Sequence, residues 1–370
     1  PIHVSFEFNT IEMEDVRKIL DKLKPKTSTG YDDISTKLLK RIAPIIIAPL
    51  TIIVNQSLCT GTFPDNLKIA KVIPLFKKGD PHILDNYRPI SLLPSMSKVL
   101  EKVVFIQIYD YFNTNNLLYN SQYGFRNKHS TELASLELTD QILQHMDNKK
   151  VPISVFLDLS KAFDTLDHSI LLQKLKYYGI KNNSLAWFQS YLSCRTQYID
   201  IDGTVSTTLA IKTGVPQGSV LGPLLFIIYM NDICMASEKF RAILFADDSN
   251  LLSTLCTFST HVSSDSSSNK KISQNINIEL ASILEWLNIN KLSLNVGKTK
   301  FMLFHFRQRK INHIVPSLEI NGKSIEQVNE FDFLGLRIDQ NLTWNAHIQK
   351  ISNKVSRTLG VMCRLKHFLP

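Results

Sequence analysis

Two adjacent carboxylates, Asp247 and Asp248, are the residues of this chain best suited to chemistry. They lie between two apolar runs, 242–245 and 251–252, and this pattern predicts a β-hairpin with the acids at its tip. Like charges side by side are unfavourable unless a cation shares the site. Side chains alternate between the two faces of a strand, so one acid can point at a metal ion while the other points elsewhere. An Asp-Asp pair alone is more often a solvated turn, so a second carboxylate is needed.

Asp158 is the candidate for that second carboxylate. It ends the apolar run 153–157, which predicts a strand. A lone Asp after a strand is usually a turn or helix cap. Two strand-end carboxylates from distant parts of the chain are what a two-Mg²⁺ phosphoryl-transfer site requires. We therefore expect Asp158 and Asp247 to lie within reach of shared ions.

Two further features could shape a substrate site. Phe163 follows Asp158 by five residues and could exclude a 2′-hydroxyl from a nucleotide sugar, or could simply belong to the core. The loop 214–219 carries two glycines, which let the backbone approach a ligand closely. Gln217 in this loop could hydrogen-bond a sugar or a phosphate, and the apolar run 220–226 after it predicts a buried helix.

Composition restricts the class of protein. The chain has 370 residues, 44% hydrophobic and 20% charged, which is typical of a globular protein with two or three subdomains. The net charge of +9 and the pI near 9.2 favour a polyanionic partner. Five scattered cysteines without zinc spacing indicate a reduced, intracellular protein. The apolar stretch Ile42–Val54, interrupted by two prolines, is predicted to be too short to span a bilayer. The chain begins without Met, so we interpret it as a fragment.

Hydrophobic periodicity predicts helices and strands in irregular alternation. Helices are expected at 11–24, 97–112, 131–146, 275–290 and from 348 onward, and one or two helices at 169–192, broken around Gly179. Short strands are expected at 299–306, 317–320 and 331–338. The basic stretch 67–80 either follows a phosphate backbone or is an edge strand protected by lysines. The Ser-rich segment Ser259–Ser268 is expected to be a flexible surface loop. The mixture predicts an α+β fold.

Seven motifs in this order resemble those of reverse transcriptases from LINE-type (non-LTR) retrotransposons of the Jockey and CR1-like branches. In chain order the motifs are NYRPISLL at 86–93, QYGFR at 122–126, FLDLSKAFD at 156–164, GVPQGS at 214–219, FADD at 245–248, LSLNVGKTK at 292–300 and FLG at 333–335. The resemblance covers the chain from about residue 15 to about residue 345. Each motif alone is moderately specific, but their order and spacing together are very specific.

The resemblance implies a role for each matching residue. Asp158, Asp247 and Asp248 would bind metal and catalyse, and Lys298, with Lys300 as the alternative, would protonate the leaving pyrophosphate. The implied substrate-binding residues are Arg88, Arg126, Phe163, Gln217 and Gly218, with Arg126 on the triphosphate and Phe163 as the sugar gate. The implied primer grip is Phe333, Leu334 and Gly335.

The resemblance also implies a right-hand polymerase fold with fingers, palm and only the start of a thumb. We expect an N-terminal helical extension at 1–66, fingers and palm at 67–338 and the truncated thumb at 339–370. The implied activity is RNA-directed DNA polymerisation with two Mg²⁺ ions, for which Mn²⁺ could substitute. The implied partners are an RNA template, a DNA primer and dNTPs, without a membrane, and an endonuclease domain in the full-length polyprotein. The expected location is intracellular, in nucleus and cytoplasm.

From the C-terminal residues we expect an amphipathic helix. Five basic residues and no acid lie between Lys350 and Lys366, and apolar residues recur there at helical spacing. The resemblance makes this the first thumb helix, with its basic face beside the primer and template. The alternative is a solvated helix docked on the palm.

Three other functions remain open from the sequence. An RNA-dependent RNA polymerase is another palm enzyme with paired aspartates, although a bulky Phe163 argues against admitting a 2′-hydroxyl. A decayed or domesticated palm domain would bind nucleic acid without catalysis. A structural protein could use the palm only as a scaffold for interactions.

Overall fold

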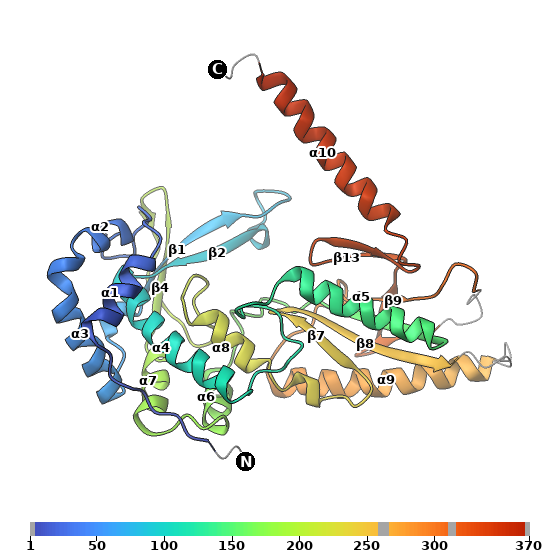
Figure 1. The fold of residues 1–370 in the computed structure, drawn as a ribbon, viewed down its shortest axis with the longest axis horizontal. Helices are drawn as coiled ribbons and strands as arrows, with labels where there is room; N and C mark the ends of the chain where they lie inside the picture. The colour runs from blue at the N-terminus through green and yellow to red at the C-terminus, as the bar shows by residue number, and fades with distance from the viewer. Residues whose placement is uncertain (1–3, 258–265, 310–315, 367–370) are drawn as a thin grey trace. The chain divides into compact units, whose positions relative to one another are not determined.

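The structure is a computed structural model that describes residues 4–257, 266–309 and 316–366 (Figure 1). The chain forms two compact units whose segments alternate along the sequence. Unit 1 comprises Pro1–Tyr119, Lys161–Asn231 and Asn290–Leu292. Unit 2 comprises Asn120–Ser160, Asp232–Ile289 and Ser293–Pro370. The division at residues 66 and 338 that the sequence suggests remains a prediction.

Unit 1 combines helices with one small sheet. Its α-helices are α1 (Met13–Lys22), α2 (Thr36–Arg41), α3 (Ala43–Thr60), α4 (Ser95–Thr114), α6 (His168–Tyr177), α7 (Asn182–Leu192) and α8 (Gly222–Tyr229). Its 3₁₀ turns are Asp65–Leu67 and Leu84–Asn86. The expected break near Gly179 is confirmed, because this residue has φ +90° and separates α6 from α7. The expected buried helix after the glycine loop is α8, which is buried at every position except Pro223.

The sheet of unit 1 contains the predicted basic strand. Its strands are β1 (Ile69–Phe76), β2 (Tyr87–Leu92), β4 (Thr196–Ile201), β5 (Thr204–Val205) and β6 (Leu209–Ala210). The order is β2-β1-β4-β5, and β6 pairs with β4. The β1 and β2 strands are antiparallel, whereas β1 and β4 are parallel. Lys71 forms an ion pair with Asp200 at 2.6 Å between β1 and β4, so this lysine is not available to a phosphate.

Unit 2 is built on a second sheet. Its helices are α5 (Thr131–Asp147), α9 (Ser266–Ile289) and α10 (Asn345–Leu365), with a 3₁₀ turn at Ile233–Met235. Its strands are β3 (Lys150–Leu157), β7 (Arg241–Phe245), β8 (Asp248–Thr257), β9 (Lys300–Leu303), β10 (Glu319–Ile320), β11 (Lys323–Ser324), β12 (Glu326–Gln327), β13 (Glu330–Phe333) and β14 (Leu336–Asp339). The main sheet has the order β12-β9-β3-β8-β7, and β10–β11 and β13–β14 are separate hairpins.

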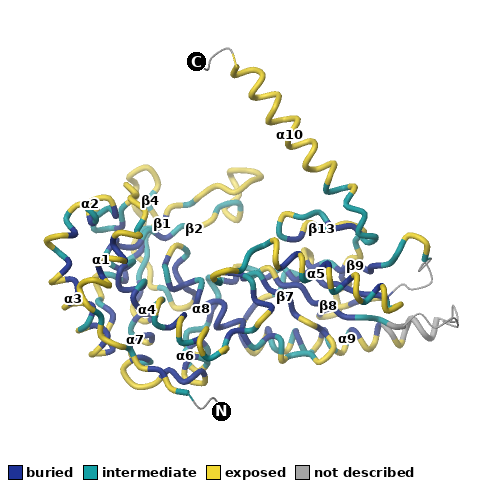
Figure 2. The backbone as a smooth tube through the Cα atoms, viewed as in Figure 1, coloured by how far each residue is buried: buried dark blue, intermediate teal, exposed yellow. Residues whose placement is uncertain are grey.

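The central strand β3 organises the core of unit 2. It is buried from Val151 to Leu157 because β8 and β9 pair with its two edges and other elements cover its faces. Phe156 packs in a cluster with Leu138 and Ile142 of α5 and with Phe333 and Ile338 of the β13–β14 hairpin. Figure 2 shows the buried centre of the unit in dark blue, in contrast to α10, which has no buried residue and is exposed from Ile348 onward.

Two predictions about secondary structure need correction. The segment 331–338 was expected to be one strand but forms the β13–β14 hairpin, because Leu334 and Gly335 adopt φ +49° and +95°. Positive φ at both central residues is the requirement of a type I′ turn. Of the Ser-rich segment, 259–265 lies outside the described residues, and 266–268 belongs to α9 rather than to a loop.

The apolar stretch from Ile42 is longer than predicted. Helix α3 continues through Pro49 for 18 residues and is long and apolar enough to cross a membrane by length and composition. A third of this window (33%) is buried inside the protein, including Ile47, Leu50 and Val54. The core helix of a globular unit passes the same test, so this feature is weak evidence for a membrane.

A buried carboxylate joins α4 to the N-terminus of α8. Glu101 has an exposed fraction of 0% and accepts hydrogen bonds from the Ser97 hydroxyl at 2.6 Å and from the Val220 and Leu221 N–H groups at 2.6 and 3.1 Å. Val220 and Leu221 immediately precede α8, so their N–H groups take no part in the hydrogen bonds of the helix, and a negative charge near a helix N-terminus is favourable. Glu101 therefore anchors the chain immediately after the loop 214–219.

We predict that Glu101→Ala lowers the free energy of unfolding by about 2–4 kcal/mol, because two buried N–H groups lose their acceptor. Chemical denaturation measures the change. Glu14→Ala is the control, since Glu14 lies on an exposed helix surface and should change stability by less than about 0.5 kcal/mol. Equal effects of the two substitutions would show that Glu101 does not stabilise the α8 terminus.

Candidate active site

The predicted hairpin with acids at its tip is present in unit 2. Strands β7 and β8 are antiparallel, with Phe245 paired to Asp248, so Ala246 and Asp247 form the turn. Ala246 has φ +58°, a conformation that residues with a side chain rarely adopt. Asp247 is half-buried, whereas Asp248 is exposed. The surrounding structure must therefore hold this turn in place.

The register of β3 against β8 brings Asp158 to the same end of the sheet. The last registered pair is Leu157 with Ser249, so the next position places Asp158 opposite Asp248, beside the turn residue Asp247. Directly opposite residues in antiparallel strands have Cα atoms about 4.5–5.5 Å apart. We expected Asp247 and Asp248 to point to opposite faces of one strand. Strand alternation does not apply to this pair, because Asp247 lies in the turn rather than in β8.

Lys298 lies close to Asp158 in this site. The segment after α9 runs alongside the end of β3, with Leu159 bridged to Leu294 and the Asn295 N–H donating to the Asp158 carbonyl oxygen at 2.8 Å. This pairing brings Lys298 Nζ to 3.9 Å from Asp158 Oδ2. Lys300, the alternative, instead pairs with Glu326 on β12. The geometry thus favours Lys298 over Lys300 as the lysine near the carboxylates.

Gln122 holds the strained turn, a role that is not among those expected from the sequence. Its side-chain Oε1 accepts hydrogen bonds from the Ala246 N–H at 3.1 Å and the Gly124 N–H at 2.8 Å. Both partners are donors, so the orientation of this buried amide is fixed. Gly124 packs so closely that a Cβ there would lie 2.3 Å from the Ala246 nitrogen. No local pattern around Gln122 indicates this role, because the turn that its amide caps lies 124 positions farther along the chain.

Glu137 of α5 holds the segment around Gln122 through several polar contacts. Glu137 accepts hydrogen bonds from Ser121 at 2.8 Å and from the Tyr123 hydroxyl, and pairs with Arg241 of β7 at 2.6 Å. Burial, followed by the bond to Glu137, raises the pKa of Tyr123 to about 12, so its hydroxyl remains a donor. Arg126, the expected triphosphate ligand, is half-buried and donates from Nη1 to the Gln122 carbonyl at 3.3 Å. Arg126 thus belongs to the same segment that supports the hairpin.

The expected primer grip is the tip of the β13–β14 hairpin. Phe333 is buried, and Phe331 stacks on Phe156 of β3 with ring centroids 4.0 Å apart. Phe156 precedes Asp158 by two residues, so the hairpin packs directly on the strand that carries the carboxylate. Leu334 and Gly335 form the turn itself and are more exposed.

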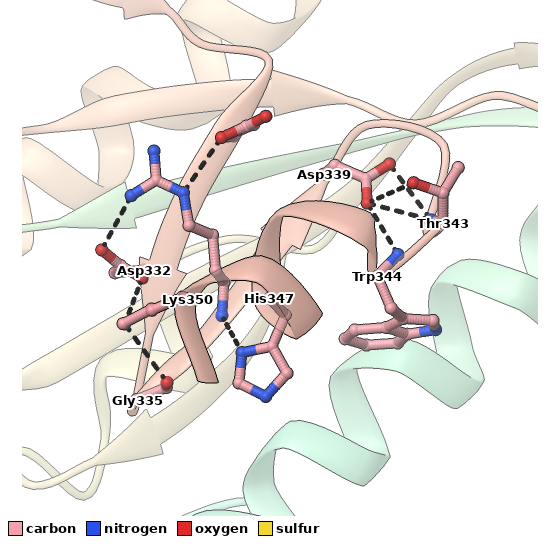
Figure 3. A network of polar contacts seen from close by, with 9 residues as sticks. Asp332, Gly335, Asp339, Thr343, Trp344, His347 and Lys350 are labelled. Atoms are coloured by element: carbon pink, nitrogen blue, oxygen red, sulfur yellow. Dashed lines mark hydrogen bonds and ion pairs between the residues drawn. The ribbon is translucent and has the colours of Figure 1, made fainter. Parts of the chain in front are cut away.

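The same hairpin fixes the start of α10 (Figure 3). Lys350 forms an ion pair with Asp332 at 2.7 Å, and the Arg337 N–H donates to His347 Nδ1 at 3.2 Å. Asp339 accepts from the Thr343 hydroxyl at 3.0 Å and from the Trp344 N–H at 3.0 Å, which shapes the turn into the helix. Lys350 is therefore paired with the hairpin, and its charge is not available to a phosphate on the basic face of the helix.

The remaining expected substrate residues lie in unit 1. Phe163 is half-buried and stacks on Phe226 of α8, with ring centroids 4.4 Å apart. Gln217 donates from Nε2 to Asp164 Oδ1 at 2.9 Å. Gly218 has φ +125°, and a Cβ there would lie 2.6 Å from the Ser91 carbonyl oxygen, so only glycine fits. Arg88 is exposed on β2.

The donor set at the end of β3 and β8 suits divalent ions bound together with a substrate. Among the described residues no group of three His, Cys, Asp or Glu side chains is close enough to hold a metal ion by itself. Mg²⁺ in phosphoryl-transfer sites is typically held by one or two carboxylates plus substrate phosphates and water. Asp158 and Asp247, both partly exposed, meet that requirement.

Comparison with known proteins agrees with this geometry. The family model described as "Reverse transcriptase (RNA-dependent DNA polymerase)" matches residues 76–338. The chain is 29% identical over 363 residues to a probable RNA-directed DNA polymerase from transposon BS of Drosophila melanogaster, covering 96% of this chain and 38% of that protein. It is 28% identical over 352 residues to the RNA-directed DNA polymerase from mobile element jockey of the same species, covering 95% of this chain and 37% of that protein.

The chain therefore spans less than two fifths of the length of these curated relatives. Among solved structures, apo telomerase from Candida tropicalis, truncated from its C-terminal domain, has a TM-score of 0.47 at 16% identity. That match covers 75% of this chain and 54% of the telomerase chain.

We predict that Gly124→Ala displaces the Ala246–Asp247 turn, because the new Cβ would overlap the Ala246 backbone. Overpacking of this kind costs about 1–3 kcal/mol of unfolding free energy. Amide hydrogen exchange should become faster in peptides that cover 241–249. Gly360→Ala is the control, since a Cβ on Gly360 in α10 meets no atom within 4 Å. An unchanged exchange rate at the hairpin in Gly124→Ala would contradict the close packing.

Proposed function

This chain belongs to the reverse transcriptase (RNA-dependent DNA polymerase) family, and we propose that it catalyses template-directed DNA synthesis on RNA. The reaction transfers a deoxynucleotide from a dNTP to the 3′-hydroxyl of a primer, within the replication of a LINE-type retrotransposon. The observation that most supports this proposal is that strand register places Asp158 opposite Asp248 and beside Asp247, inside the region that matches the family.

Reverse transcriptases as a family use divalent metal ions, and we propose Mg²⁺, with Mn²⁺ as a substitute. Asp158 and Asp247 would hold the ions, with Asp248 beside them. Such ions supply charge stabilisation for the phosphoryl group and activate the attacking hydroxyl. The task of the protein is to fix both carboxylates in advance, and the β3–β8 register and the Gln122 hydrogen bonds provide that fixed arrangement.

Lys298 is the proposed proton donor to the leaving pyrophosphate. Its ion pair with Asp158 is long, at 3.9 Å, and the Lys298 side chain is 71% exposed. An ion pair this exposed is weak, so the lysine can leave Asp158 and reach a phosphate oxygen. Arg126 is the proposed triphosphate ligand, because a guanidinium binds two phosphate oxygens at once, which a lysine cannot do.

The nucleic acid would contact α10 and the β13–β14 hairpin. An open hollow of about 650 Å³ lies between them, lined by Glu330, Arg337, Ala346, Gln349, Lys350, Asn353, Lys354, Arg357 and Thr358. Arg337 and Lys350 are engaged by carboxylates of the hairpin. In the part of the chain that the structure describes, no carboxylate forms an ion pair with Lys354 or Arg357. These two cations are the proposed phosphate contacts in the hollow.

The alternatives receive less support. The relatives compared above are RNA-directed DNA polymerases by name, which favours DNA synthesis over RNA synthesis. Phe163, held by its stack on Phe226, is the proposed barrier to a ribose 2′-hydroxyl. The endonuclease domain of a longer polyprotein and the location in nucleus and cytoplasm remain predictions.

We predict that Asp158→Asn or Asp247→Asn lowers primer extension on poly(rA)/oligo(dT) by more than about a hundredfold, because charge stabilisation of the transferred phosphoryl group is lost. The unfolding midpoint should stay the same or rise, since removing one of several crowded acids relieves repulsion. Asp202→Asn, in an exposed turn of unit 1, is the matched control and should retain activity. Full extension by either active-site variant would exclude the proposed role.

A double substitution, Lys354→Ala with Arg357→Ala, should weaken binding of a primer–template duplex and make its salt dependence shallower. The slope of log K against log salt should fall by up to about 0.9 for each phosphate that the protein no longer neutralises. Lys18→Ala with Lys22→Ala, on α1, removes the same charge elsewhere and should leave the slope nearly unchanged. Fluorescence anisotropy across a salt series measures both. If the two double variants had equal slopes, α10 would not touch the phosphate backbone.

A further inference from the structure

The hydrophobic pattern of β8 specifies its register against β3 only weakly. Strand β3 is buried from Val151 to Leu157, so it offers apolar surroundings on both faces. In β8, Leu251 and Leu252 follow one another and both are buried. Successive side chains of a strand point to opposite faces. A shift of β8 by one residue past β3 would therefore exchange one leucine for the other, and the pattern distinguishes the two arrangements poorly.

The structure already contains such a shift at the end of β8 far from the carboxylates. Lys150 of β3 pairs with Thr257, and Pro152 pairs with Thr254. Two steps along β3 thus correspond to three steps along β8. One extra residue of β8 lies between these pairs, which is the arrangement of a β-bulge. The register of β8 therefore changes by one residue at this end of the sheet.

Movement of this bulge would displace the carboxylates. If the extra residue migrated along β8 to the end near the turn, Asp158 would face Ser249 instead of Asp248. Asp248 and its neighbour Asp247 would advance by one residue, about 3.3 Å, relative to Asp158. The observed site therefore requires an interaction that keeps the bulge at its present end.

A buried hydrogen bond lies between the bulge and the carboxylates. Asn250 Nδ2 donates to Ser154 Oγ at 2.5 Å, and both residues have an exposed fraction of 0%. Asn250 is opposite Phe156 of β3 and Ile243 of β7, which both belong to the apolar cluster of this unit. Directly opposite side chains share one face of the sheet, so a one-residue shift would turn Asn250 to the other face, away from Ser154. The hydrogen bond therefore depends on the observed register.

This polar pair is not the most stable way to fill the core. In the part of the chain that the structure describes, Asn250 Oδ1 accepts no hydrogen bond. A buried amide oxygen without a partner loses the hydrogen bonds that it would make to water, which lowers stability. Apolar side chains of similar volume are often as stable or more stable in such a place. A buried polar contact that forms in one register alone instead excludes the other registers.

We propose that Ser154 and Asn250 are positioning residues that hold β8 in its register and so keep Asp158 opposite Asp248. The inference rests on the proposed function, because the shared metal site is what needs this alignment. Mg²⁺ binds oxygen atoms at about 2.1 Å in nearly ideal octahedral geometry, so a displacement of about 3.3 Å between the acids would abolish joint binding. The hydrogen bond thus acts on the metal site without touching metal or substrate.

The first test compares variants of the full chain that differ only in the hydroxyl at position 154. Ser154→Thr keeps the hydroxyl, whereas Ser154→Val has a side chain of nearly the same size without it. Primer extension on poly(rA)/oligo(dT) should need the wild-type Mg²⁺ concentration in Ser154→Thr and about tenfold more in Ser154→Val. Ser154→Val with Asn250→Leu should also need about tenfold more, although its unfolding midpoint should equal or exceed that of the wild type.

The second test measures the register independently of activity. In the perdeuterated chain, NOEs between backbone amide protons connect residues that face each other across β3 and β8. Wild type and Ser154→Thr should show one set of contacts, in which Leu157 faces Ser249. Ser154→Val with Asn250→Leu should show a second set, in which Leu157 faces position 250.

Val155→Ala is the control for lost packing. Val155 is buried and points to the face of β3 opposite Ser154. Its truncation should lower the unfolding midpoint but leave one set of contacts and the wild-type Mg²⁺ requirement.

The proposal is overturned if Ser154→Val with Asn250→Leu keeps a single set of contacts in the wild-type register. It is also overturned if Ser154→Thr and Ser154→Val need the same Mg²⁺ concentration. A wild-type chain that extends no primer would contradict the proposed function instead, and the NOE contacts would still decide the inference.

Discussion

The register of β3 against its two neighbours is the constraint on which the rest of the candidate site depends. Pairing with β8 brings Asp158 opposite Asp248 and beside Asp247, and pairing with β9 brings Lys298 toward Asp158. A slip of one residue would move every side chain of β3 to the other face of the sheet. Because β3 is buried on both faces, such a slip would remove Phe156 from its cluster with α5 and the β13–β14 hairpin, so side-chain packing protects the geometry of the carboxylates.

Two supports act on this register from different directions. Gln122 accepts a hydrogen bond from the strained Ala246 turn, and Gly124 packs against its backbone. Glu137 of α5 holds the segment of Gln122 and Gly124 and pairs with Arg241 of β7. Phe331 stacks on Phe156, so the β13–β14 hairpin is attached to the same strand. That hairpin in turn fixes the start of α10 through Asp332 and Lys350. A disturbance of α10 therefore has a continuous packed route to the strand that ends at Asp158.

The sequence alone predicted the elements whose signals are local. The acidic hairpin tip follows from apolar runs flanking two aspartates, and the buried helix α8 follows from an uninterrupted apolar run. Local signals failed where a turn changed the alternation of side chains, as at Asp247 and in the β13–β14 hairpin. They also failed where the partner is distant. Nothing near Gln122 indicates that its amide caps the Ala246 turn, and nothing near Gln217 indicates its bond to Asp164. Such contacts depend on tertiary packing, which periodicity does not encode.

The central claim is that two segments far apart in the sequence hold the same ions, and affinity cleavage tests it most directly. Fe²⁺ replaces Mg²⁺ in the presence of duplex and dNTP, and ascorbate with peroxide then generates hydroxyl radicals at the bound metal. The account predicts backbone cuts in two places on the same molecule, around Asp158 and around Ala246–Asp248, that excess Mg²⁺ suppresses. Cuts confined to one of these segments, or distributed elsewhere along the chain, would contradict a shared metal site.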